Sequence, residues 1–226
     1  MSERIARYGS LCIAVLTAAL AVPGAASAAG GHYVIDGGTP QEQAQVRAAL
    51  DASRYEWSLV PAQITITIRR GYGSCGVPGQ IFLDANLLDA GHFSWGVVQH
   101  EYAHQVDFFL LDDAGRALLA AALGGRSWWQ TSQRLPHGEL TSERFASTLA
   151  WAYWPTPDNV MRPSSPGDEA GSPSPEAFRA LLSRRGYRGA APSIEWSCRR
   201  RRKFPPRSAP CGSSSHSEEV ADHAVA

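Results

Sequence analysis

Two histidines and a glutamate stand close together in the segment His100-Glu101-Tyr102-Ala103-His104. In a helix, residues four apart lie one turn apart on the same face, so His100 and His104 can offer two imidazole nitrogens to one cation. Glu101 lies about 100° around the helix axis from His100, at the border of that face. Its carboxylate can then take a proton from metal-bound water instead of binding the metal. The spacing therefore predicts a hydrolytic metal site with Glu101 as general base.

The surroundings of this motif favour a buried site. Residues 94–111 are predicted to form a helix that Ser94 can cap, and they are apolar on most faces, with Val98, Val106 and the run 108–111 among the apolar positions. Such a helix is buried in a globular protein. Burying two histidines and a glutamate there costs free energy unless a partner satisfies them. The alternative interpretation is a helix whose polar residues face a cleft without a metal.

A catalytic zinc needs about three protein ligands and an open position for water. Glu143 is the first candidate for the third ligand, because the residues one and two turns after it are small and would let its helix approach the metal helix closely: Ala146, Ser147 and Ala150. The alternative role for Glu143 is to stabilise the N-terminus of its own helix. Glu139, one turn earlier, is the second candidate ligand, and His137 and Asp107 follow.

Other polar residues are considered for supporting roles. Asp107 is placed to accept the second N–H of His104 and so to fix its tautomer. His137 or Tyr153 could donate to the oxyanion that forms when water attacks a carbonyl, although a surface histidine and a helix-end aromatic are the simpler interpretations. The tryptophans that flank these segments are expected in the core: Trp95, Trp128, Trp129, Trp151 and Trp154.

The segment from His100 to His104 resembles the motif of the zincin metallopeptidases. Within them the chain looks most like the glutamate-ligand (gluzincin-like) branch, because Glu143 is followed by small residues as in that branch. The glycine and third histidine that continue the metzincin motif are absent from residues 105–111. The resemblance implies a zinc peptidase in which His100, His104 and Glu143 hold Zn²⁺ and residues 81–84 form a strand that lines the substrate cleft.

The elements expected before the metal helix are one helix and two strands. Residues 40–53 are predicted to form an amphipathic helix with Thr39 as its cap and a proline in the first turn. Residues 63–68 alternate strictly, which is typical of a half-buried strand. The glycine-rich residues 71–79 are expected to form a loop, and residues 81–84 a second short strand.

After the metal helix, residues 113–123 and 139–153 are predicted to be helical, residues 161–175 to form a loop, and residues 176–184 to form another helix. This order of helix, strands and further helices indicates an α+β fold. Together with the resemblance, it implies a zincin-like domain with a small, mostly antiparallel sheet packed on the buried metal-binding helix.

The N-terminal residues have the pattern of an export signal. Arg4 and Arg7 precede the apolar run 11–22, and small residues around Ala28 suit a signal peptidase. The run is shorter than the roughly 20 residues that span a bilayer, and an uncleaved anchor is the alternative. We therefore expect a signal peptide over residues 1–28 and a secreted protein with no stable membrane insertion after cleavage.

Residues 29–190 are predicted to form a single domain, and residues 191–226, rich in Arg, Pro and Ser, to be a disordered tail. The formal net charge of +0 gives no reason to expect a nucleic-acid partner. After cleavage three cysteines remain, and pairing of Cys198 with either Cys75 or Cys211 is open.

These observations predict a secreted zinc-dependent metallopeptidase that acts on a peptide or protein substrate. One alternative is an exported zinc-binding module without turnover, because a complete set of ligands does not guarantee a productive cleft. The other is a zinc amidase acting on cell-wall amides, since the same metal and base would serve that reaction.

Overall fold

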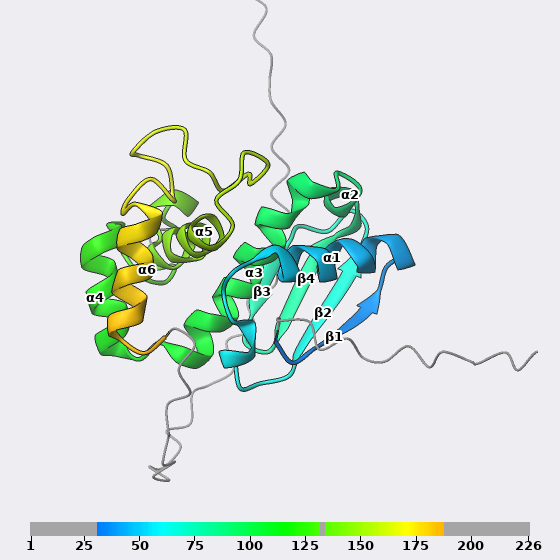
Figure 1. Cartoon of the computed structure of the whole chain (residues 1–226), viewed down its shortest axis with the longest axis horizontal. Helices are drawn as coiled ribbons and strands as arrows, with labels where there is room; N and C mark the ends of the chain where they lie inside the picture. The colour runs from blue at the N-terminus through cyan, green and yellow to red at the C-terminus, as the bar shows by residue number, and fades with distance from the viewer. Residues whose placement is uncertain (1–30, 132–133, 188–226) are drawn as a thin grey trace, which may run out of the picture.

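The computed structural model describes residues 31–131 and 134–187 (Figure 1). The signal peptide expected over residues 1–28 and the tail expected over residues 191–226 lie outside the described residues. The described part contains one four-stranded sheet and six α-helices. The predicted α+β class is therefore confirmed.

The sheet is mixed, and its strands follow the order β1-β2-β4-β3. Strand β2 pairs in parallel with both β1 and β4, whereas β3 pairs antiparallel with β4. The prediction of a mostly antiparallel sheet is therefore wrong. The strands are β1 (Tyr33–Gly37), β2 (Ile64–Arg69), β3 (Cys75–Val77) and β4 (Gln80–Asp84).

Two strands that were not predicted, β1 and β3, account for the difference. The chain passes from β1 to β2 through helix α1 (Pro40–Ala52), and a helical crossover returns the next strand in the same direction. Strand β3 lies in the glycine-rich segment expected to be a loop, and it takes the edge position beside β4. Among the described strands, only the β3–β4 pair is antiparallel.

Helix α3 (His92–Leu110) lies between two groups of elements: the sheet with α1 and α2 on one side, and α4, α5 and α6 on the other (Figure 1). Residues 98–107 are all buried, as predicted for this helix. It begins at His92, earlier than predicted, with Gly91 as its N-cap residue, and Gly91 has a φ of 61° that favours glycine. Ser94 instead donates its hydroxyl hydrogen to the Gly91 carbonyl oxygen from inside the first turn.

Helix α5 (Thr141–Tyr153) packs extensively against α3. The small residues Ala146, Ser147 and Ala150 are all buried, at 0, 1 and 0 % exposure. Because short side chains occupy this stripe, the two helix backbones can approach closely. The first turn of α5, which carries Glu143, is thereby held beside the middle of α3.

Replacing Ala146 by leucine is expected to lower the free energy of unfolding by about 1–3 kcal/mol, because the larger side chain would overpack a fully buried position. Urea denaturation measures the change. The same substitution at the exposed Ala121 is the control and should change the free energy by less than about 0.5 kcal/mol. Equal midpoints for the two variants would show that this part of the core has room for a larger side chain.

The remaining helices lie close to their predicted positions. Thr39 caps α1, since its hydroxyl accepts from the backbone N–H of Glu42 and the Glu42 carboxylate accepts from the backbone N–H of Thr39. Helices α4 (Asp113–Leu123) and α6 (Pro175–Arg184) match the predictions, and the short α2 (Ala85–Leu88) was not predicted. Within the described ranges, no helix has the length and apolarity needed to cross a membrane.

Candidate metal centre

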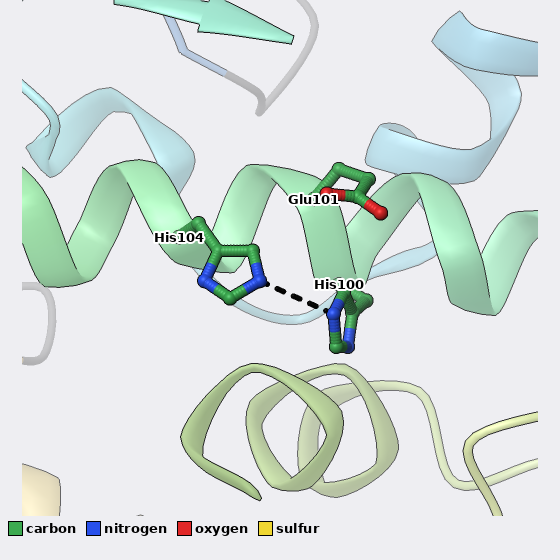
Figure 2. Close-up of side chains that lie close together, drawn as sticks. All are labelled: His100, Glu101 and His104. Carbon is green, nitrogen blue, oxygen red and sulfur yellow. Dashed lines mark hydrogen bonds between the residues drawn. The ribbon is translucent and has the colours of Figure 1, made fainter. Parts of the chain in front are cut away.

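The two histidines of the motif project from the same side of α3. The Nε2 atoms of His100 and His104 lie 3.2 Å apart, as the dashed line in Figure 2 shows. Both residues are buried, at 4 and 7 % exposure. The helical spacing thus brings two imidazole nitrogens to one point beneath the protein surface.

Glu143 reaches the same point from the first turn of α5. Its Oε2 atom lies 3.2 Å from Nε2 of His100 and 3.2 Å from Nε2 of His104. The three atoms therefore form a triangle with nearly equal edges. A tetrahedral zinc with ligand bonds of about 2.0–2.1 Å places neighbouring ligand atoms about 3.3–3.4 Å apart. The triangle has the size of one face of such a coordination shell.

The hydrogen bonds around His100 decide where its proton lies. The Ser147 hydroxyl donates to Oε2 of Glu169 at 2.7 Å, and a hydroxyl has only one hydrogen to give. Ser147 must therefore accept from Nδ1–H of His100, which lies 3.0 Å away. In a neutral imidazole, the Nε2 atom then carries a lone pair, and this lone pair is directed at Glu143.

His137 has a similar arrangement, and its ring stacks near that of His100, with the centroids 6.1 Å apart. Its Nδ1 atom is 2.5 Å from Oε1 of Glu169, and its Nε2 atom is 3.0 Å from Oε2 of Glu143. Lone pairs on neighbouring atoms repel unless a proton or a cation lies between them. His100, His137 and Glu143 form a group of potential ligand atoms within 4.8 Å of one another. Imidazole nitrogens with one carboxylate oxygen are ligands that zinc accepts, so the cluster fits a zinc ion.

The pKa shifts describe the cluster without a metal, in which protons lie between the histidine nitrogens and the Glu143 carboxylate. Burial opposes a charge on Glu143, but hydrogen bonds from His100, His104 and His137 outweigh it and hold its pKa far below the ordinary value. Burial also opposes a charge on His104, and the hydrogen bond and charge of Glu143 raise its pKa nevertheless. Hydrogen bonds with Glu143 and then Glu169 raise the pKa of His137 to about 10. A bound metal would displace these protons.

Glu101 lies beside the two rings, on the adjoining part of the α3 surface (Figure 2). Its carboxylate comes within 4.8 Å of the potential ligand atoms of His100 and His104. Burial raises the pKa of Glu101, and the neighbouring charges of His100 and His104 only partly offset this. Glu101, both motif histidines, His137 and Glu143 line one pocket of about 380 Å³. An acid or base at this position is within reach of a molecule in that pocket.

Glu139, the second candidate for the third ligand, lies outside this cluster. It ends the short 3₁₀ helix His137–Glu139, and its Oε2 atom is 2.9 Å from Nη1 of Arg126. The structure therefore brings Glu143, and not Glu139, to the motif histidines. His137 takes part as well, from the opposite end of the same short helix.

Two residues considered for supporting roles have other neighbours than expected. The Asp107 carboxylate accepts from Nε of Arg116 at 2.8 Å and from Nε1 of Trp128 at 2.9 Å, instead of from His104. Tyr153 packs in the core, with its ring 5.0 Å from that of Tyr55 and nearly perpendicular to it. Tyr153 does not line the pocket, so it is not placed to meet an oxyanion there.

The walls of the pocket also differ from the prediction. Residues of β3 and its preceding turn line it, namely Ser74, Cys75 and Gly76, and not residues 81–84 of the neighbouring strand. Cys75 is disulfide-bonded, and Cys12, Cys198 and Cys211 lie outside the described residues.

An aromatic pair forms another wall of the pocket. The rings of Phe108 and Trp129 stack with their centroids 5.5 Å apart and their planes at 13°. Trp129 is 42 % exposed, so the expectation that it belongs to the core is wrong. Both rings line the pocket and give it an apolar side next to the histidines.

Glu169 was not among the site residues predicted from the sequence. This residue lies in the segment 161–175, where Pro, Ser and Gly give no periodic pattern from which a neighbour could be inferred. Ser147 was noted only for its small size, and its hydrogen bond to His100 depends on the packing of α5 against α3. The only signal for Glu169 is an acidic residue in a predicted loop.

No family model, curated protein or solved structure matches this chain. The functional assignment therefore rests on the residues of this site and on their geometry.

Proposed function

We propose that this chain is a secreted zinc-dependent metallopeptidase with a zincin-like, gluzincin-type site. His100, His104 and Glu143 would hold the zinc ion, and Glu101 would act as general base. The observation that supports this most strongly is the triangle of Nε2, Nε2 and Oε2 atoms with edges of 3.2 Å. Glu101 lines the same pocket, which gives the site a base as well as ligands.

The reaction divides its tasks among a few groups. When bound, zinc supplies a Lewis acid that lowers the pKa of water and polarises a carbonyl. Glu101 takes a proton from the attacking water while the water oxygen bonds to the peptide carbonyl carbon. Glu101 then gives this proton to the leaving nitrogen as the C–N bond breaks. Because Glu101 lies beside the ligand histidines, it can do this without occupying a ligand position.

A peptide substrate is supported by the edge of the sheet. Strand β3 is at the end of the strand order and lines the pocket through Cys75 and Gly76. An extended peptide can add to such an edge through main-chain hydrogen bonds. The arrangement of a histidine-bearing helix, a glutamate-bearing helix and an edge strand is the zincin-like part of the proposal.

Removing the metal is expected to abolish hydrolysis. A chelator should remove one zinc per chain and all casein cleavage, and adding back one equivalent of zinc should restore the rate. Elemental analysis and a fluorescent casein assay measure the two quantities. Cleavage at the full rate by protein shown to be free of metal would contradict the proposal.

A second candidate is an exported zinc-binding module without turnover. It is favoured by His137, whose Nε2 atom lies 3.0 Å from Oε2 of Glu143. With His100, His104 and Glu143, this histidine would complete four protein ligands, and a closed shell leaves no position for water. Protein that holds one zinc per chain but cleaves nothing in a broad peptide library would support this candidate.

A further inference from the structure

The carboxylate of Glu169 connects two of the histidines of the candidate metal centre. Oε1 of Glu169 lies 2.5 Å from Nδ1 of His137, and Oε2 accepts from the Ser147 hydroxyl at 2.7 Å. Ser147 in turn lies 3.0 Å from Nδ1 of His100. Glu169 therefore reaches His137 directly and His100 through one hydroxyl group.

The directions of these hydrogen bonds are fixed by the groups that make them. An ionised carboxylate only accepts, so both Ser147 and His137 must donate to Glu169. Ser147 also lies 3.5 Å from Sδ of Met161, but the nearer carboxylate is by far the stronger acceptor. With its hydrogen used, Ser147 accepts from His100. The network thus holds a hydrogen on Nδ1 of both histidines and turns both Nε2 atoms toward Glu143.

The segment that presents Glu169 is itself firmly held. The neighbouring Asp168 carboxylate accepts from the backbone N–H groups and the hydroxyls of Ser164 and Ser165. Arg144, the residue after Glu143, donates to the Gly138 and Gly167 carbonyl oxygens. Arg144 therefore ties both the His137 turn and the Glu169 segment to α5.

We propose that Glu169 is a positioning residue of the metal centre, which orients His100 through Ser147 and His137 by direct contact. The inference rests on the proposed function in that it takes the cluster to be a zinc site. A partner that orients a ligand histidine also makes its free nitrogen a better ligand, and loss of such partners costs about 10–100-fold in metal affinity. Glu169 contacts His137 directly and reaches His100 through Ser147, so its removal should weaken zinc binding by about 10–100-fold.

Glu169→Gln is the sharpest test because glutamine keeps the size of the side chain but has one acceptor oxygen instead of two. Either Ser147 or His137 must then face an NH₂ group. We expect the variant to bind zinc about 10–100-fold more weakly in competition with a chromophoric chelator. The visible spectrum of the Co²⁺-substituted protein should also shift, since that spectrum reports the geometry of the ligands.

The matched control is Glu176→Gln on α6, where the exposed carboxylate pairs with Arg179, at 2.9 Å. This variant should keep the wild-type zinc affinity and Co²⁺ spectrum. A purely structural role of Glu169 would lower the thermal midpoint of the metal-free protein but leave the Co²⁺ spectrum unchanged. Wild-type affinity and an unchanged spectrum in Glu169→Gln would overturn the inference.

Ser147→Ala provides a second variant that removes only the His100 branch, and it carries the test if Glu169→Gln does not fold. It should weaken zinc binding as well, and its effect should combine with that of Glu169→Gln less than additively, because both act through one network. Full additivity would overturn the inference. These measurements need no hydrolysis, so a wild-type protein that binds zinc but cleaves nothing would defeat the proposed function and leave the role of Glu169 standing.

Discussion

Replacing Glu101 by glutamine is expected to slow peptide hydrolysis by about 10²–10⁴-fold while the zinc content stays at one per chain. Glutamine has nearly the same size and keeps an acceptor oxygen, but it cannot take a proton from water. Because Glu101 lines the pocket as the proposed base and is not one of the three proposed ligands, the change should remove the base and leave zinc bound. Casein cleavage and elemental analysis of the same preparation measure both quantities.

Glu139→Gln is the control for this substitution. Glu139 pairs with Arg126 and does not line the pocket, so its replacement should leave the rate within about twofold of wild type. Hydrolysis by Glu101→Gln at the wild-type rate would show that another group is the base. Loss of zinc from Glu101→Gln would instead show that Glu101 is a ligand, which its distance of less than 4.8 Å from the histidine nitrogens allows.

The local geometry of α3 and α5 is the part of the site that could be predicted from the sequence. A helix repeats every 3.6 residues whatever surrounds it, so the spacing of His100 and His104 alone predicts that their rings project from one face. The same rule predicts that Ala146, Ser147 and Ala150 lie on one stripe. One further assumption was needed, namely that small residues mark a close contact between helices. It predicts that this stripe is buried and that Glu143, at its head, lies near the histidines.

The sheet and the walls of the pocket could not be predicted in this way. Strand β3 is three residues long and contains Gly76, so neither an alternating pattern nor β-branched residues mark it as a strand. Its glycine is explained only by tertiary structure: a Cβ atom there would lie 3.1 Å from the Glu101 carbonyl oxygen and 3.2 Å from Cβ of His104. Gly76 was predicted to be a loop glycine, but it lies where the edge of the sheet touches α3.

Residues that act through contacts distant in the sequence were the hardest to foresee. Glu169 and His137 are 32 residues apart, and each lies in a segment without regular periodicity. Nothing local determines that their side chains meet, because their contact depends on how two irregular segments fold over α5. Asp107 shows the converse, since its position on α3 was predicted but its partners, Arg116 and Trp128, come from outside that helix.

Replacing Glu143 by alanine is expected to remove stoichiometric zinc from the purified protein. The substitution deletes the carboxylate oxygen that lies 3.2 Å from both motif histidines. Even the loss of a group that only orients a ligand costs about 10–100-fold in metal affinity, so the loss of a ligand should cost more than about 100-fold. Chelator competition measures the affinity, and hydrolysis should fall with the metal content.

Glu139→Ala is the matched control, because it makes the same change at a nearby glutamate that ends the preceding 3₁₀ helix. Its carboxylate pairs with Arg126, so zinc should be retained. Loss of zinc from Glu139→Ala and retention by Glu143→Ala would assign the third ligand to Glu139. Retention by both would instead leave His137, whose Nε2 atom lies 3.0 Å from Oε2 of Glu143, as the remaining nearby ligand. A site built from three histidines would still accept zinc, but its bound ion would lack the negative charge that Glu143 supplies.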